Sequence, residues 1–197
     1  MHNNSIHSNI SFSQKYRVIL TQKCPRTCPG CINTVDGVLN KAKHLTLPEI
    51  KADGDDIVLT GGDPAIYPKL QQVIEELRNI NPLSKLFVYS SKVTKLLLSS
   101  MEKLDGVTFT LHYPLSLKDI NEFNLFQKTA RSIKAKKPEK SYRLCVDSRI
   151  NQKELSIDKD LYSRLDTIKW MNREEILAQK DRNFGCPKDE QLVLLKE

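Results

Sequence analysis

The chain has 197 residues, a size that suits one domain, and its 39% hydrophobic and 28% charged residues are ordinary for a soluble globular protein. No apolar run approaches the roughly 18 residues of a membrane helix, and the polar first residues lack the pattern of a secretory signal, so we expect a cytoplasmic protein with no membrane partner. The formal net charge of +7 comes from lysines spread along the chain without a nucleic-acid-binding motif, so we do not expect nucleic acid as a direct partner.

Short apolar runs alternate with amphipathic stretches along the chain. Six runs predict strands, at residues 16–20, 57–59, 86–89, 107–111, 143–146 and 167–170. Helices are predicted at residues 68–79, 94–104 and 117–135, with shorter helical segments near 47–51 and 161–165. The first long helix has apolar residues at helical spacing, at Leu70, Val73, Ile74 and Leu77.

This alternation predicts an α/β fold with a parallel sheet. Six strand–helix units are fewer than the eight of a closed barrel, so we expect a partial (β/α)6 TIM-like barrel. The expected organisation is a loose N-terminal arm at residues 1–14, the partial barrel at 15–172 and a C-terminal extension at 173–197.

Three of the five cysteines fall within eight residues, directly after the first predicted strand. A disulfide framework favours an even number of dispersed cysteines, so the cluster of Cys24, Cys28 and Cys31 indicates a metal site. Three thiolates in a C-x3-C-x2-C spacing suit an iron–sulfur cluster and leave one iron open. The alternatives are a zinc site that recruits His44, Cys145 or Cys186 as a fourth ligand, and three cysteines placed together by chance.

A second motif, Gly61-Gly62-Asp63-Pro64, stands at the end of the second predicted strand. Two glycines at a strand end allow the backbone to approach a ligand closely, and the adjacent carboxylate could pair with an ammonium group. The simpler interpretation is an ordinary turn between a strand and a helix.

The order of these motifs, a strand, then C-x3-C-x2-C, then a strand that ends in GGDP, resembles the radical S-adenosylmethionine (SAM) superfamily. The resemblance implies a [4Fe–4S] cluster on Cys24, Cys28 and Cys31, and SAM bound to its open iron. It also implies that Gly61, Gly62 and Asp63 contact the SAM amino group, with Pro64 beside them. The reduced cluster would cleave SAM to a 5′-deoxyadenosyl radical that abstracts a hydrogen from the substrate.

One position departs from the family pattern, which commonly has an aromatic residue before the third cysteine. Here that residue is Gly30, which would lie beside the cofactor. The segment Cys28-Pro-Gly-Cys-Ile-Asn33 is similar to the Cys-Pro-Gly-Cys-Tyr-Asn of the anaerobic ribonucleotide reductase activases, which also carry GGDP.

Further cofactor and substrate contacts are expected at the carboxyl ends of the strands. His112 is a candidate catalytic residue, with a structural hydrogen-bonded histidine as the alternative. Cys186 is a second candidate, as a hydrogen-atom donor or a thiol near the substrate. We expect a buried thiol at Cys145 and core packing at Trp170. The other residues that follow strands are Ser90, Ser91, Tyr113, Asp147, Arg149 and Asn172, and of these Ser90 and Asp147 are candidate cofactor contacts.

Three hypotheses remain open from the sequence. The first is a radical SAM enzyme that acts on a small molecule or nucleotide and draws electrons from a flavodoxin- or ferredoxin-type donor. The second is an activase that installs a radical on a glycyl-radical protein partner. The third is a non-enzymatic, zinc-stabilised binding module.

Overall fold

The computed structural model describes residues 15–28, 31, 33, 39–170, 174–175 and 190–196. These residues form one parallel sheet in the order β2-β8-β1-β3-β4-β5-β6-β7. The strands are β1 (Lys15–Thr21), β2 (Lys43–Leu45), β3 (Ile57–Gly61), β4 (Leu86–Ser90), β5 (Gly106–Leu111), β6 (Ser141–Asp147), β7 (Arg164–Ile168) and β8 (Glu190–Leu195). The expected α/β fold, a partial TIM-like barrel with a parallel sheet, is confirmed.

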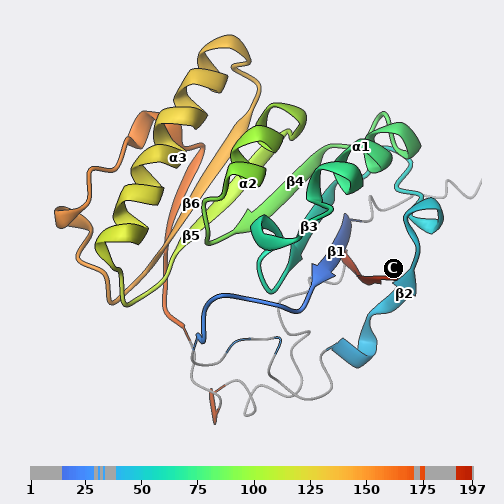
Figure 1. Cartoon of the computed structure of the whole chain (residues 1–197), viewed down its shortest axis with the longest axis horizontal. Helices are drawn as coiled ribbons and strands as arrows, with labels where there is room; N and C mark the ends of the chain where they lie inside the picture. Colours follow the sequence, from blue (N-terminus) through green and yellow to red (C-terminus); the bar gives the residue numbers. More distant parts are fainter. Residues whose placement is uncertain are drawn as a thin grey trace, which may run out of the picture.

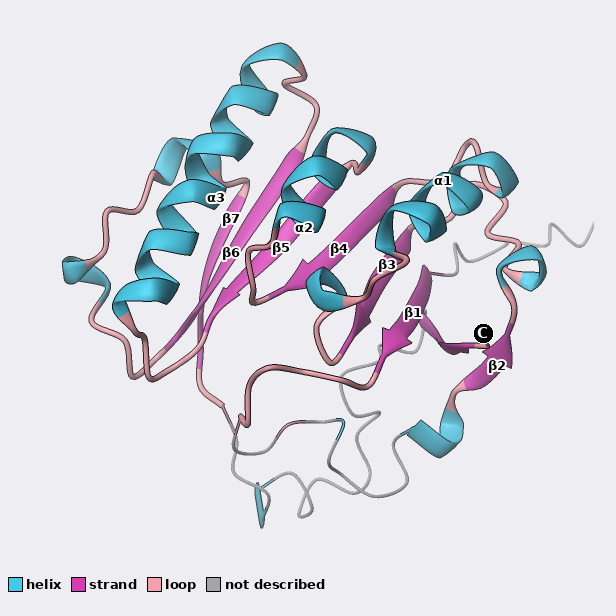
Figure 2. Ribbon diagram, viewed as in Figure 1, coloured by secondary structure: helices cyan, strands magenta, loops and turns pink. Residues whose placement is uncertain are grey.

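Within the described residues, α-helices cover one face of this sheet (Figure 1), and Figure 2 shows the same layers by type of structure. They are α1 (Leu70–Ile80), α2 (Lys95–Ser100) and α3 (Leu117–Lys136). The four apolar residues predicted to face the core from α1 are all buried. None of the helices within the described residues has the length and hydropathy of a membrane span.

Alternate residues of each strand point toward the helices or away from them. The core lies on the helix side and includes Leu59, Val88, Phe109 and Leu144, one residue from each of the neighbouring strands β3, β4, β5 and β6. The opposite side, which we call the inner face, carries more polar residues. It presents Val58, Tyr89, Thr108 and Arg143, among others, from the same four strands.

Short 3-10 helices complete the described elements. They are η2 (Leu39–Lys41), η3 (Leu47–Glu49), η4 (Pro64–Ile66), η5 (Met101–Lys103), η6 (Gln152–Glu154) and η7 (Lys159–Leu161). The short helix expected near residues 47–51 is therefore present as η3, where a Thr46–Glu49 capping box begins it.

Two parts of the expected pattern are wrong. The segment 161–165 is not helical, because η7 ends at Leu161 and β7 begins at Arg164. Leu161 and Leu165 have the spacing of one helix face, but Leu165 lies on an edge strand and is 38% exposed. Within the described part of the chain the sheet also has eight strands instead of six, because β2 and β8 add to it beside β1.

Candidate functional site

A cavity of about 150 Å³ lies at the carboxyl ends of β1, β3, β4 and β5, where parallel sheets bind ligands. Cys24, Cys28 and Cys31 all line it. The rest of its wall comes from the neighbouring strand ends and the residues that follow them: Asn33, Thr60, Gly61, Gly62, Tyr89, Ser90, Ser91, Thr110, His112 and Trp170. The fold thus brings together the three cysteines, the two glycines, Ser90 and His112, which are far apart in the sequence.

Gly61 and Gly62 hold the end of β3 against the chain that enters the cysteine loop. The Gly62 N–H donates to the Thr21 carbonyl at 2.6 Å, and the Asp63 N–H donates to the Lys23 carbonyl at 3.0 Å. Gly61 has a φ of +137°, and a Cβ atom on Gly62 would lie 2.0 Å from the Lys23 carbonyl oxygen. Because only glycine permits this approach, the pair fixes where the cysteine loop begins.

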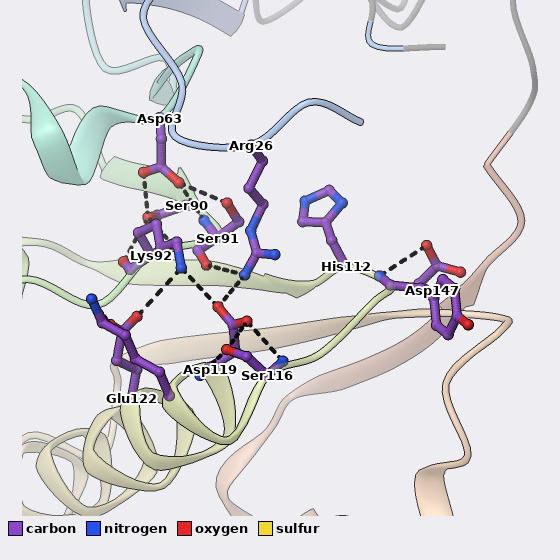
Figure 3. Close-up of polar contacts among 12 residues, drawn as sticks. Arg26, Asp63, Ser90, Ser91, Lys92, His112, Ser116, Asp119, Glu122 and Asp147 are labelled. Carbon is purple, nitrogen blue, oxygen red and sulfur yellow. Dashed lines mark hydrogen bonds and ion pairs between the residues drawn. The ribbon is translucent and has the colours of Figure 1, made fainter. Parts of the chain in front are cut away.

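The Asp63 carboxylate is fully buried and joins the ends of β3 and β4 (Figure 3). One oxygen accepts from the Ala65 N–H at 3.0 Å and the Ser90 hydroxyl at 2.7 Å. The other accepts from the Ser91 N–H at 2.9 Å and the Ser91 hydroxyl at 2.7 Å. Asp63 therefore directs its carboxylate at the β4 end, and neither it nor the buried Pro64 is among the described residues that line the cavity.

Arg26, between the first two cysteines, anchors their loop to the start of α3 (Figure 3). Its guanidinium donates to the Asp119 carboxylate at 2.7 Å and to the Ser91 carbonyl at 3.5 Å. Lys92 donates to the same carboxylate oxygen at 2.7 Å. The carboxylate is only 9% exposed, and it also caps α3 through a reciprocal capping box with Ser116.

The pKa of Asp119 reflects these contacts. Burial by itself would raise the pKa of this carboxyl, but hydrogen bonds from Lys92 and Ser116, together with the Arg26 charge, hold it well below its usual range. Asp119 is therefore ionised at any pH near neutrality, and it serves as the common counter-ion of the two cations.

We expect Asp119→Asn to lower the free energy of unfolding by about 2–4 kcal/mol at pH 7, because Arg26 would stay half-buried without its counter-ion and Lys92 would keep only the more distant Glu122 carboxylate, at 3.8 Å. Thermal melts should show Tm lowered by roughly 5–12 °C. A carboxyl with a depressed folded pKa stabilises the fold above its unfolded pKa. The difference between the two proteins should therefore be constant from pH 5 to 8 and shrink below about pH 4.

The matched control is Asp166→Asn, which removes the partner of Arg164 from a largely exposed ion pair. Such pairs contribute about 0–1 kcal/mol, so this variant should melt close to the unmodified protein. Equal losses in the two variants would contradict the role given to Asp119.

His112 lies against the second cysteine, and its Nδ1 is 3.4 Å from the Cys28 sulfur. The imidazole also contacts Trp170, with ring centroids 4.9 Å apart. Burial, followed by the nearby Arg26 charge, lowers the pKa of His112 to about 4, so the ring is neutral at pH 7. Which nitrogen carries the proton then depends on the partner of Nδ1.

The expectation that Trp170 packs in the core is wrong. Trp170 is only half-buried and lines the cavity beside His112. Its indole Nε1 is buried and has no hydrogen-bond partner among the described residues. Because this N–H is buried, the part of Trp170 that faces the cavity is the rest of the indole ring, which offers an apolar surface beside His112.

The remaining predicted residues have other positions. Asp147 is buried, and its carboxylate accepts hydrogen bonds from the Tyr113 N–H and from the Arg149 guanidinium. The hydrogen bond from Arg149 is the main reason that the pKa of the Asp147 carboxyl is lowered to about 2. Asp147 is not among the described residues of the cavity wall. Cys145 is half-buried on β6, not fully buried as expected. Three predicted residues lie outside the described residues: Gly30, Asn172 and Cys186.

The three cysteines fit the donor set of an iron–sulfur cluster. Burial raises the pKa of Cys24 and Cys28, so metal binding would have to displace their protons. Within the described residues, no three His, Cys, Asp or Glu side chains surround one ion position, as a zinc site requires. A cubane cluster takes each thiolate on a different iron, and the described residues of the cavity wall include three thiols and no carboxylate.

No family profile and no curated protein matches the sequence. The structure is similar to that of SuiB from Streptococcus suis bound to S-adenosylmethionine, with a TM-score of 0.54 and 12% identity over 95% of this chain and 48% of that chain. SuiB bound to its precursor peptide SuiA gives a TM-score of 0.55 at 12% identity, over 82% of this chain and 40% of that chain. The fold and the site thus define a class of protein, a parallel α/β partial barrel with a cysteine-lined cavity.

That fold is shared with a protein that binds S-adenosylmethionine. The chain spans about half the length of SuiB, and at 12% identity the likeness concerns the fold alone.

Proposed function

We propose that the protein is a radical SAM enzyme in which Cys24, Cys28 and Cys31 hold a [4Fe–4S] cluster. The observation that carries the proposal is the gathering of these three thiols with Gly61 and Gly62 around one cavity at the strand ends. The order of the C-x3-C-x2-C and GGDP motifs, which resembles the radical SAM superfamily, supports it. The SAM-bound state of SuiB, a protein of similar fold, is consistent with it.

The chemistry supplied by the bound group is reductive cleavage of SAM to methionine and a 5′-deoxyadenosyl radical that abstracts a hydrogen from the substrate. The chain's own residues would position and shield the reactants. Gly61 and Gly62 line the cavity at the β3 end and hold the start of the cysteine loop against β3, and the Trp170 ring covers the wall beside His112. A ligating thiolate can only accept hydrogen bonds, so His112 would donate its Nδ1–H to the Cys28 sulfur.

Finer parts of the assignment remain proposals. The substrate is a small molecule or nucleotide, and the electron donor is a flavodoxin- or ferredoxin-type protein. Gly30, Ser90 and Asp147 are proposed as cofactor contacts, and His112 and Cys186 as catalytic residues. Activation of a glycyl-radical partner is the alternative within the same chemistry.

The test is anaerobic reconstitution with iron and sulfide, followed by incubation with SAM and dithionite. We expect bound iron and sulfide in equal amounts and formation of 5′-deoxyadenosine, measured by liquid chromatography. Protein that binds zinc in place of iron and sulfide and leaves SAM intact would refute the proposal.

A further inference from the structure

A second cavity of about 120 Å³ lies on the inner face of the sheet, toward the amino ends of the strands. Its apolar wall is formed by Val58, Phe87 and the ring of Tyr89, from the adjacent strands β3 and β4. Thr108 and Ser141 add hydroxyl groups from β5 and β6. This combination of a flat apolar wall with a few polar groups is typical of a site for a small organic molecule.

The described cavity wall carries two basic and two acidic residues, and Arg17 beside it adds the positive charge that leaves an excess. Glu190 is neutralised by Arg17, whose guanidinium lies 2.6 Å from the carboxylate and 5.3 Å above the Tyr89 ring. Lys15 and Arg143 also line the cavity, and neither makes an ion pair with another described residue. Only the Asp56 carboxylate opposes these two cations among the described residues of the cavity wall. The net positive charge around the cavity therefore favours a ligand with one negative charge over a phosphate dianion.

Tyr89 connects the second cavity to the first. Tyr89 belongs to the walls of both cavities, so the two cavities are neighbours on the same face of the sheet. A substrate anchored at this position could extend past Tyr89 toward the groups held by the cysteines.

We propose that the second cavity is a substrate subsite that binds the carboxylate of a small organic acid through Arg143 and Lys15, with its apolar part against Phe87 and Tyr89. The role as a substrate subsite rests on the proposed radical SAM function, whereas binding of the acid does not. Arginine supplies a planar pair of N–H donors that matches a carboxylate, and the lysine ammonium adds a point charge.

The experiment uses three probes of similar shape on the ¹⁵N-labelled full chain: benzoate, phenyl phosphate and benzylammonium. We expect benzoate to give saturable NMR shifts at the amides of Val58, Phe87, Gly106 and Thr108. Phenyl phosphate should bind more weakly, and benzylammonium should give no saturable shifts. Arg143→Gln should weaken benzoate binding about tenfold, since a charge-assisted hydrogen bond is lost.

Two further variants make the test specific. Lys15→Gln should also weaken benzoate binding, and it gives an independent measurement if Arg143→Gln alters the fold. Lys118→Gln is the matched control, because Lys118 is 81% exposed on α3 and lies outside the cavity. It should leave the affinity unchanged.

Benzoate shifts that map elsewhere, equal affinity in Arg143→Gln and the unmodified protein, or tighter binding of phenyl phosphate would each overturn the proposal. The binding measurement needs neither cluster nor SAM, so it is separable from the SAM-cleavage assay. Benzoate binding without SAM cleavage would retain the acid site and reject only its role in a radical reaction. SAM cleavage without benzoate binding would reject the acid site alone.

Discussion

Cys28→Ala is expected to lose both bound iron and the formation of 5′-deoxyadenosine after anaerobic reconstitution. Cys28 is one of the three thiols around the cysteine-lined cavity, and it is the one that His112 contacts. With two thiols left, the cluster would lose one of its three protein ligands. Loss of a residue that only supports a ligand already reduces metal affinity roughly 10–100-fold, so we expect loss of a ligand itself to exceed roughly 100-fold.

Cys145→Ala is the matched control for this experiment. Cys145 is half-buried on β6 and is not among the described residues of the cavity wall. Burial raises the pKa of its thiol, which keeps it protonated at neutral pH. This variant should therefore bind iron and cleave SAM like the unmodified protein. Equal SAM cleavage by Cys28→Ala and Cys145→Ala would contradict the assignment of the ligands.

Asp63→Ala is expected to lower the free energy of unfolding by about 3–5 kcal/mol. The substitution removes a fully buried carboxylate and leaves the donors of Ala65 and Ser91 without their acceptor, while the Ser90 hydroxyl keeps only the Lys92 carbonyl. In a chain of this length the loss corresponds to a fall in Tm of roughly 6–15 °C. Chemical denaturation and thermal melts measure the two quantities.

Asp63→Asn tests the geometry more finely. An amide keeps one acceptor oxygen but turns an NH2 group toward donors of Ser90 or Ser91, so a loss smaller than that of alanine is expected. Asp160→Ala is the control, because Asp160 is an exposed aspartate of η7, and its change should stay within about 0.5 kcal/mol.

The same variants separate two roles for the aspartate of the GGDP motif. A carboxylate that pairs directly with the SAM ammonium would, when removed, weaken SAM binding and leave the melting temperature nearly unchanged. A carboxylate that supports Ser90 and Ser91 in the cavity wall would lower the melting temperature first. The saturated hydrogen bonding of Asp63 favours the second outcome, and unchanged stability in Asp63→Ala would exclude it.

The positions of the central strands and of α1 could be predicted from the sequence, because hydrophobic periodicity is a local property. The buried face of α1 and the strands from β3 to β6 follow directly from that pattern. The edges of the sheet could not be predicted in this way. Leu192–Leu195 is a short apolar run whose partner, β1, lies more than 170 residues earlier. Nothing in a local pattern specifies such a pairing.

The candidate site likewise has one part that the sequence predicts and one part that only the fold determines. The spacing of Cys24, Cys28 and Cys31 is local, and three thiols on one short loop are enough to indicate a metal. The sequence pattern does not predict the pairing of Arg26 with Asp119, although Arg26 stands inside the cysteine motif and Asp119 belongs to a Ser-x-x-Asp capping pattern. The two residues meet only because the fold brings together positions that are 93 residues apart.

The sequence by itself determined the alternation of strands and helices, the cluster of three thiols and the glycines that a close backbone approach requires. Tertiary structure decided where the side chains between these elements point. In the folded chain the Asp63 carboxylate accepts hydrogen bonds at the end of β4, His112 contacts Cys28, which is 84 residues away, and Trp170 lines the cavity. The physical reason is that local structure depends on neighbouring residues, whereas these contacts depend on the order and twist of strands that are distant in the chain.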